Sequence, residues 1–456
     1  MTERKPPSRL KVLSLNVNNS REGVMAPLLR DPNALRFDII AIQEPWRLHK
    51  DYGGGTHNPA KDLFTAIVPP EEDEDTHART CIFVNKRIAH RNITTYANNP
   101  HICTIKIIAA QDDGEDTPVY IHSVYNPPRD DVGLRALETA LKRADEEPRA
   151  EGTRQPEHVI VGDFNVHHAM WGGRGTTSSS YADHLLGIID SHDLTFSSPR
   201  GKGTRNILQQ GTQTNNTLDL VLLSRGLVDQ LERCILRPSL CHDSDHLPTE
   251  TVLRLAPPLE AVKEHKQWER VDPDRFRDML DMSLPDPPDQ PLDTEEEVDG
   301  FAERITEAIG EAIRVAVPVA ISSQKYERPG FTPECKAAVE AAKAARVRVR
   351  RRPGDEELQE EYRQARQKKK RMVKRSLTKA HRERVTAANG DIGQVWKLAK
   401  WARDRTPRQA FTPTLRAGDV TADTAAAKVK LLGESFFPKP PLHSWTTSGT
   451  RSIQSH

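Results

Sequence analysis

The sequence predicts a layered α/β (α+β) fold over its first 255 residues, followed by a mostly helical, basic C-terminal region. Residues 9–255 alternate short apolar, β-branched runs with loops and few helical stretches, a pattern typical of a sandwich and not of a helix bundle. From Val298 onward, long segments rich in Ala, Arg, Lys and Glu favour helices. Pro257-Pro258 and the Pro-rich, acidic stretch 285–297 separate the two regions.

Short runs of β-branched and aromatic residues bounded by turn residues predict the strands of this fold. The expected strands are Leu10–Val17, Phe37–Ile42, Phe64–Val68, Arg79–Val84, Ile102–Ala109, Val119–Val124, His158–Val161, Thr217–Leu223, Cys234–Leu236 and Thr249–Leu253. The expected helices between them are Arg21–Arg30, Val132–Glu147 and Ser180–His192. In the second helix, Leu134, Leu137 and Leu141 form one apolar stripe at helical spacing.

These patterns predict four regions along the chain. We expect a catalytic domain over residues 8–255, a linker over 256–300, a helical basic connector over 301–437 and a disordered tail over 438–456. The connector includes a further helix candidate at residues 421–437.

Composition narrows the class of protein. The chain has 456 residues, enough for two or three domains, and its net charge of +1 gives no general indication of nucleic-acid binding. Five scattered cysteines without metal-type spacing indicate a reducing compartment. The N-terminal Met1–Pro7 has no apolar core, so no signal peptide is expected, and no run of about 18 apolar residues predicts a membrane span. We expect a nuclear protein, or a cytoplasmic one before import, that is not secreted.

The stretch from Val159 to Asn165 carries the strongest chemical signal. Its β-branched residues predict a buried strand, Gly162 frees the backbone, and Asp163 and Asn165 follow where the strand ends. Residues two apart on an extended chain point to the same side, so a carboxylate and a carboxamide are presented together. One can accept a proton and the other can donate to an anion, which suits phosphate-ester hydrolysis.

Polar residues also end or interrupt four other apolar runs, as the parts of a single site would. They are Asn16, Glu44, Tyr125 with Asn126, and Asp219 with the later Ser244-Asp245-His246. Each has an ordinary structural explanation when taken alone, because strand ends are commonly polar. Asp219, flanked by leucines, requires a buried partner, and His246 is the natural one.

In order, these motifs resemble those of the endonuclease/exonuclease/phosphatase superfamily. Val124–Pro128, Gly162–His168 and Trp171-Gly172 are further similar to the endonuclease domain of non-LTR retrotransposons. The resemblance covers residues 8–255. It implies a four-layer α/β sandwich of two packed mixed β-sheets flanked by helices, with metal-dependent cleavage of double-stranded DNA to a 3′-hydroxyl and a 5′-phosphate. In a retrotransposon, that hydroxyl primes reverse transcription at the target.

The resemblance also implies a role for each site residue. Glu44, Asn16 and Asp245 would hold or orient Mg²⁺, with Mn²⁺ as the alternative ion. Asp163 would activate the attacking water and Asn165 would position it. The remaining catalytic candidates are His246, oriented and kept charged by Asp219, and Tyr125, which would donate to the phosphate.

Three further residues are candidate substrate contacts on the neighbouring loops. They are Asn126, His167 and Arg174. For His167 a structural loop contact is the preferred alternative, and for Arg174 a solvated surface position is at least as good an explanation.

The basic region leaves two interpretations open. Residues 363–384 contain eleven Lys or Arg, with Glu383 as the only acid. A helix of this composition is charged on most faces and is not expected to bury itself. It could bind a phosphate backbone, with the element's RNA as a second partner beside DNA, or it could be a solvated spacer. Lys368–Arg371 also fits a nuclear-localisation run.

Other functions remain open at this stage. An apurinic endonuclease or an inositol or lipid phosphatase would use the same fold, because specificity lies on loops. A decayed element could keep the fold as a nucleic-acid-binding remnant without turnover. No reverse-transcriptase domain is recognised in the sequence, so the resemblance ends before that part of such an element. The target sequence and the oligomeric state are not readable from these patterns.

Overall fold

A computed structural model describes the fold of most of the chain. The residues described are 9–47, 58–69, 77–89, 93–110, 116–147, 154–209, 212–257, 264–266, 268–288, 294–321 and 330–388, with isolated positions and short pieces up to 436. The tail predicted to be disordered, 438–456, lies outside the described residues. The chain divides into two compact units, one formed by residues 1–260 with 328–456 and one by residues 261–327.

The first sheet of the larger unit has six strands in mixed orientation. Only its β1–β2 pair is parallel among the described pairs, with Asn16 opposite Gln43 at the end of both strands. In spatial order the strands are β13 (Leu231–Leu236), β14 (Thr249–Leu253), β1 (Leu10–Asn16), β2 (Ile39–Gln43), β4 (Thr80–Asn85) and β3 (Phe64–Ile67).

The second sheet also has six strands and one parallel pair, β7–β8, among those described. Its strands are β5 (Ile93–Asn99), β6 (Ile102–Ala110), β7 (Asp116–Tyr125), β8 (Glu157–Asp163), β12 (Asp219–Ser224) and β9 (Leu194–Phe196). The middle of β8, Val159–Val161, is apolar because both faces of the strand are covered. Val159 and Val161 enter the core between the sheets, whereas Ile160 enters the core under the helices.

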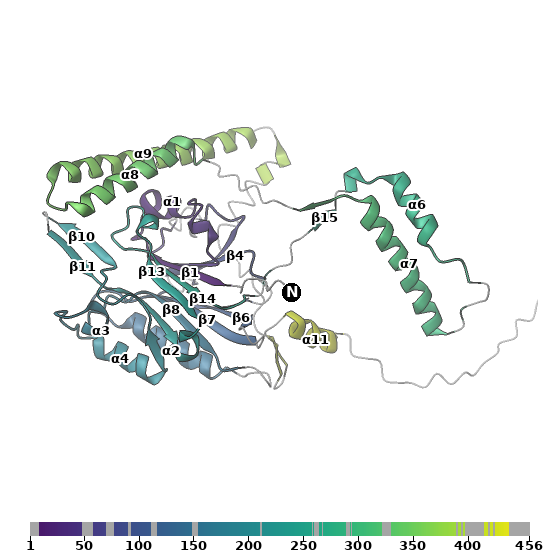
Figure 1. The fold of residues 1–456 in the computed structure, drawn as a ribbon, viewed down its shortest axis with the longest axis horizontal. Coiled ribbons are helices and arrows are strands. Elements are labelled where there is room, and N and C mark those ends of the chain that lie inside the picture. The colour runs from purple at the N-terminus through teal and green to yellow at the C-terminus, as the bar shows by residue number, and fades with distance from the viewer. Residues whose placement is uncertain are drawn as a thin grey trace, which may run out of the picture. The chain divides into compact units, whose positions relative to one another are not determined.

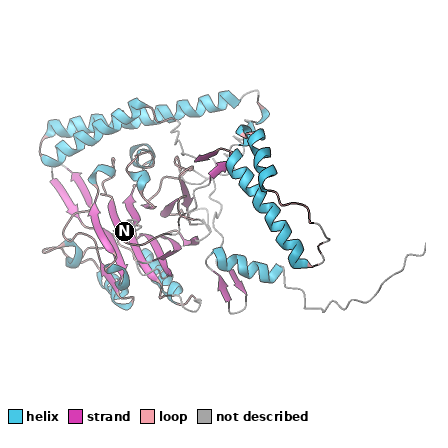
Figure 2. Cartoon of the chain, turned by 45° about the vertical axis from the view of Figure 1, so that its right-hand side comes forward, coloured by secondary structure: helices cyan, strands magenta, loops and turns pink. Residues whose placement is uncertain are grey.

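Helices complete the layers on the outside of the sheets (Figure 1). α2 (Val132–Asp145), α3 (Ala169–Gly172) and α4 (Ala182–Ser191) pack on the second sheet through a cluster that includes Leu137, Trp171 and Leu185. The expected stripe Leu134, Leu137 and Leu141 is buried there. The two sheets with their flanking helices confirm the predicted four-layer sandwich, and Figure 2 shows the strands gathered between the helices.

Several elements differ from the sequence prediction. The expected helix at 21–30 is a π-helical turn, η1 (Arg21–Met25), followed by a short α1 (Ala26–Leu28). The strands β5 and β9 and the hairpin β10 (Arg205–Gln209) with β11 (Thr212–Asn216) were not predicted. The hairpin sequence is mostly Asn, Gln and Thr, so it lacks the apolar alternation that marks a half-buried strand. Its pairing depends on main-chain hydrogen bonds.

The C-terminal part of the larger unit contains the expected helices. α8 (Pro333–Arg351) and α9 (Glu356–Ala388) lie against each other, with the short pieces β17 (Leu415–Ala417), β18 (Val420–Ala422) and α11 (Ala425–Phe436) after them. The expectation that the basic helix cannot bury itself is wrong for one of its faces. Lys369 and Val373 of α9 are buried.

The smaller unit is a helical pair with a short two-stranded sheet. Asp272 caps α6 (Pro273–Ser283), and Thr294 forms a capping box with Glu297 at the start of α7 (Glu295–Ala316). β15 (Glu264–Lys266) pairs with β16 (Val319–Ile321). Across the part of the chain that the structure describes, no helix combines the length and apolarity needed to cross a membrane.

Candidate active site

Three neighbouring strands of the second sheet bring polar side chains to one edge. Tyr125, the last residue of β7, is the register partner of Asp163, the last residue of β8. On the other side, Asp163 pairs with Asp219, the first residue of β12. Neighbouring strands lie about 4.8 Å apart, so these three side chains are close although 94 residues separate Tyr125 from Asp219 in the sequence.

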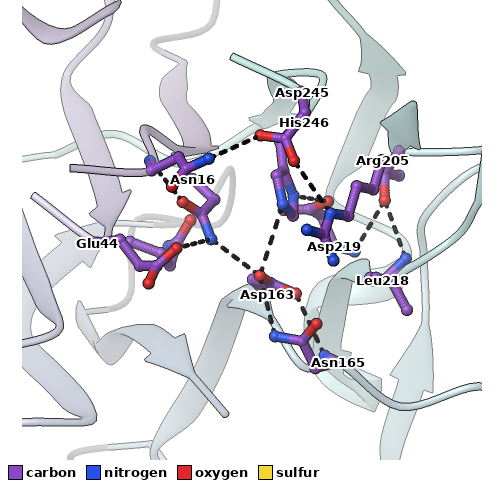
Figure 3. A network of polar contacts seen from close by, with 12 residues as sticks. Asn16, Glu44, Asp163, Asn165, Arg205, Leu218, Asp219, Asp245 and His246 are labelled. Atoms are coloured by element: carbon purple, nitrogen blue, oxygen red, sulfur yellow. Dashed lines mark hydrogen bonds and ion pairs between the residues drawn. The ribbon is translucent and has the colours of Figure 1, made fainter. Parts of the chain in front are cut away.

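The first sheet delivers its polar strand ends to the same place. Asn16 ends β1, and Glu44 follows directly after β2. The Asn16 side-chain amide donates to Asp163 Oδ2 at 2.9 Å and to Glu44 Oε2 at 3.2 Å. Asn16 therefore joins the two sheets through their functional groups, as Figure 3 shows.

His246 enters from the loop between β13 and β14. Its Nδ1 donates to Asp219 Oδ2 at 2.8 Å, and its Nε2 lies 3.8 Å from Asp163 Oδ2. Asp163, Asp219 and His246 are 1%, 4% and 3% exposed, respectively. The three side chains form a buried carboxylate–imidazole–carboxylate row.

Burial and mutual charge set the protonation of this row. Burial raises the pKa of Asp163 to about 7, although the nearby His246 opposes the shift. Burial alone would lower the pKa of His246, but the carboxylates of Asp219 and Asp163 outweigh it and raise that pKa to about 9. Near neutral pH, Asp163 can therefore gain or lose a proton while His246 remains charged.

Asp245 precedes His246 and faces a second cation. Arg205 Nε donates to Asp245 Oδ2 at 3.1 Å, and Asn18 Nδ2 lies 3.5 Å from Asp245 Oδ1. Although burial acts to raise the pKa of Asp245, the charges of His246 and Arg205 lower it. Arg205 is the first residue of β10. The structure places it on this carboxylate.

Sequence reasoning missed Arg79, which precedes β4. Its Nη2 donates to Glu44 Oε1 at 2.8 Å and to the Tyr125 hydroxyl at 3.2 Å, and its guanidinium carbon lies 4.8 Å from the centre of the Tyr125 ring. Burial, followed by the charge of Glu44, raises the pKa of Tyr125 to about 12. The phenol is therefore protonated and able to donate. A cation at the start of a predicted strand was the only available signal for Arg79.

Two site residues have left-handed backbone conformations that are uncommon for side chains other than glycine. Glu44 has φ +47° and Asn165 has φ +49°. The amide of Asn165 donates to Asp163 Oδ1 at 3.2 Å, and its side-chain Nδ2 donates to Asp163 Oδ2 at 3.2 Å and to the Asn126 carbonyl at 2.9 Å. This concentration of local strain is typical of a functional site.

The three candidate substrate contacts lie outside this hydrogen-bonded row. The Asn126 side chain fixes the entry to α2, because it accepts from Gly133 N at 3.0 Å and donates to the Asp130 carbonyl at 2.7 Å. His167 bonds through its backbone to Ser179. Arg174 is exposed on the loop after α3.

The donor set fits a divalent cation. Asp163, Asp219 and His246 each offer a ligand atom, and these atoms lie within 4.8 Å of one another. The carboxylates of Glu44 and Asp245 and the side-chain oxygen of Asn16 are hard oxygen donors of the kind that Mg²⁺ prefers. Because His246 remains charged near neutral pH, both of its ring nitrogens carry a proton there and it acts as a hydrogen-bond donor instead of a metal ligand.

One family comparison matches part of the chain. Residues 119–250 match the family model described as "Endonuclease-reverse transcriptase". This segment carries Tyr125, Asp163, Asp219 and His246, and the match confirms the resemblance drawn from the sequence motifs. No curated protein matches the chain.

Solved structures with a similar fold cover about half of the chain. The endonuclease domain of TRAS1, a telomere-specific non-LTR retrotransposon, is 16% identical and has a TM-score of 0.41, with 54% of this chain and 98% of that domain covered. The APE2 catalytic domain of Xenopus laevis is 14% identical with a TM-score of 0.43, and the match covers 56% of this chain and 94% of that one. The AP endonuclease LMAP of Leishmania major is 15% identical with a TM-score of 0.41, with coverages of 55% and 89%. At these values, the likenesses carry no argument about activity.

Proposed function

We propose that this chain is a metal-dependent DNA endonuclease of retrotransposon type. It would hydrolyse a phosphodiester bond to a 3′-hydroxyl and a 5′-phosphate. The observation that carries the proposal is the buried row of Asp163, His246 and Asp219, which Asn16 and Glu44 join from the opposite sheet. This row combines a base of tuned pKa with a charged donor, and both are needed to cleave a phosphodiester.

In this proposal, Asp163 is the general base. With its pKa raised to about 7, the carboxylate can take a proton from the attacking water and still be ionised in much of the population. Asn165 is held against Asp163 by two hydrogen bonds, so it can position that water.

His246 and Tyr125 act as donors to the phosphate. His246 carries a positive charge near neutral pH and uses Nδ1 to contact Asp219, so its Nε2 edge is available for a phosphoryl oxygen after Asp163 has moved to the water. Tyr125 keeps its proton and is held by Arg79. Fixed donors of this kind stabilise charge as it develops in the transition state.

Glu44, Asn16 and Asp245 are the residues proposed to hold the cation. A bound Mg²⁺ would neutralise the scissile phosphate and stabilise the leaving oxygen. Arg79 bonds to Glu44 Oε1, whereas Asn16 bonds to Oε2, so this carboxylate is oriented from both sides.

Double-stranded DNA is the proposed substrate, and the retrotransposon setting gives the reaction its purpose. The family match supports an endonuclease that is associated with reverse transcription. The 3′-hydroxyl released at a nick would prime that synthesis on chromosomal DNA, which makes the nucleus the proposed place of action.

Nicking of supercoiled plasmid by purified full-length protein tests the proposal. We expect Mg²⁺-dependent conversion to open circles, loss on chelation, and at least about a hundredfold loss in Asp163→Ala and in His246→Ala. Asp190→Ala, which removes an exposed carboxylate on α4, is the matched control and should nick like the wild type. Wild-type rates in both site variants would remove the assignment.

A substrate panel separates the alternatives that share this fold. Intact duplex, an abasic-site duplex and an inositol phosphate are compared at equal enzyme concentration. Preference for either of the latter two would replace the proposed substrate. Salt-sensitive DNA binding without hydrolysis of any of them would indicate a non-catalytic remnant.

A further inference from the structure

The helical pair α8–α9 packs on the nuclease fold by an apolar contact. Ala26 of α1, Cys335 of α8 and Val373 of α9 are buried together, with Phe331 and Leu377 against them. Figure 1 shows the two helices running alongside each other over α1, and both helices belong to the same compact unit as the two sheets. The pair is therefore an added layer of the nuclease unit.

The polar contacts of this pair converge on one loop. Arg346 of α8 donates through Nη1 to the carbonyl of His242 at 2.6 Å and through Nη2 to the carbonyl of Ser244. One planar guanidinium thus spans two carbonyls that lie two residues apart. The loop contains a left-handed residue, His242 with φ +50°, so its conformation needs outside support.

α9 contacts Asp243, the residue between His242 and Ser244, through an ion pair. Lys369 Nζ lies 2.7 Å from Asp243 Oδ2 and donates to the Gly23 carbonyl at 2.7 Å. Both charged side chains are only 1% exposed. An ion pair so deeply buried is costly to separate, because either partner alone would be left charged without solvent.

The loop leads directly into the active site. Ser244 Oγ donates to the Asn16 carbonyl at 2.6 Å and accepts from the amide of His246 at 3.1 Å. The residues that follow Ser244 are Asp245 and His246. α8 and α9 therefore contact residues 242–244, and the next two residues in the chain carry the proposed metal-binding and phosphate-contacting side chains.

We propose that Arg346 and Lys369 are positioning residues, and that the α8–α9 pair clamps residues 242–244 so that Asp245 and His246 are held in their working geometry. The catalytic consequence rests on the proposed endonuclease function. The clamp itself concerns only the conformation of the loop, so the order of the loop can be measured without any reaction.

The kinetic test compares full-length Arg346→Met with Arg348→Met. Arg348 lies two residues further along α8, is exposed and pairs with Glu361, so this control removes the same charge from another face. We expect kcat for plasmid nicking to fall at least tenfold in Arg346→Met with KM within twofold of the wild type. Arg346→Lys should recover part of the loss, because it keeps one donor, and Arg348→Met should behave as the wild type. Equal kcat in all four proteins overturns the clamp.

Hydrogen exchange gives an answer that does not depend on nicking. The amides of residues 242–246 should exchange at least tenfold faster in Arg346→Met than in Arg348→Met, while peptides from β7 and β8 keep their protection. Unchanged exchange in the loop, or faster exchange throughout the sheets, overturns the clamp. A wild-type protein that cleaves nothing overturns the proposed function instead, and the exchange result still decides the clamp.

Discussion

At the scale of single residues, the site holds the pKa values of two neighbouring groups, Asp163 and His246, apart. Asp163 and His246 share a buried environment, yet burial dominates the carboxyl group while neighbouring charge dominates the imidazole. The result is a base with a pKa of about 7 beside an acid with a pKa of about 9. Environments that push two pKa values apart in this way assign the roles of base and acid.

The rate of nicking should follow a bell-shaped pH profile. Asp163 has to lose its proton, so activity should rise as pH increases through about 7, and His246 has to keep its proton, so activity should fall as pH increases through about 9. Initial rates measured at constant ionic strength and saturating Mg²⁺ test this. A rate that stays flat from about pH 6 to about pH 10 would contradict the assignment of both residues.

Replacing Asp219 by Asn should move both limbs of that profile to lower pH, because the Asp219 charge raises the pKa of His246 and also that of Asp163. The variant keeps the shape of the side chain but removes the charge that favours the imidazolium, so the pKa of His246 should drop by about 1–3 units. Nicking at pH 8 should weaken by about twofold to about a hundredfold, depending on the size of that drop. The acidic limb, set by Asp163, should also lie at lower pH, because that carboxyl group loses the repulsion of the Asp219 charge. An alkaline limb at its wild-type position would show that Asp219 does not support the charge of His246.

The sequence identified most of this site because its side chains stand at recognisable places. Asp163 follows an uninterrupted apolar strand, and Asp219 lies between leucines where an ionised group needs a partner. Arg79 could not be found in this way. A cation at the start of a strand is common, and only the register of β4 against β2 brings it to Glu44.

At the scale of elements, β8 is the piece that places the site, and its glycine allows the strand to lie where it does. A Cβ on Gly162 would stand 2.0 Å from the Val124 carbonyl oxygen of the parallel neighbour β7. The obstacle is backbone, so it cannot be relieved by rotating a side chain. The alignment of Tyr125 with Asp163 therefore depends on the missing methyl group.

Gly162→Ala should destabilise the protein by about 2 kcal/mol or more. Gly187→Ala is the matched control, because its Cβ would meet nothing within 4 Å in the interior of α4. That substitution should be neutral or stabilise by up to about 1 kcal/mol. Chemical denaturation of both variants provides the measurement. Equal stability of the two would mean that the β7–β8 approach is not as close as described.

The helices and strands could be predicted where burial imposes a regular pattern of apolar residues on the sequence, and they were missed where it does not. The apolar runs of β1, β2, β7 and β8 were all identified, because their side chains fill the core between two covered faces. The β10–β11 hairpin has no such requirement, and its polar sequence reads as a loop. The π-helical turn η1 also carries no periodic signature in five residues.

At the scale of the whole molecule, the basic helix α9 is joined to the two-sheet sandwich by a buried ion pair. This contact could not be predicted from the sequence, because Lys369 is one cation among eleven in residues 363–384 and only its partner distinguishes it. Asp243 lies 126 residues earlier in the sequence, in the loop that precedes His246. Contacts at such separations are created by tertiary packing and have no local pattern.

Lys369→Met should destabilise the protein by about 3–5 kcal/mol, because it leaves the Asp243 carboxylate buried without its closest cation. The double variant Lys369→Met with Asp243→Asn should recover a large part of that loss. Lys374→Met, at an exposed position on α9, should change stability by less than about 0.5 kcal/mol. Thermal and denaturant unfolding of the wild type, Lys369→Met, Asp243→Asn and the double variant form a double-mutant cycle. Simple additivity of the two single effects would contradict a direct pairing.

The order of pairing in the first sheet sets when this protein can begin to work during its synthesis. β1 lies between β2 and β14, and Leu10 is opposite Leu253. A ribosome must therefore deliver more than 240 further residues before the strand made first gains its second neighbour. Until then one edge of β1 has no neighbouring strand, and His246 has not yet been synthesised to join Asn16 at the site. The cluster of Asp163, Asp219 and His246 is likewise incomplete until translation has passed the loop that precedes β14.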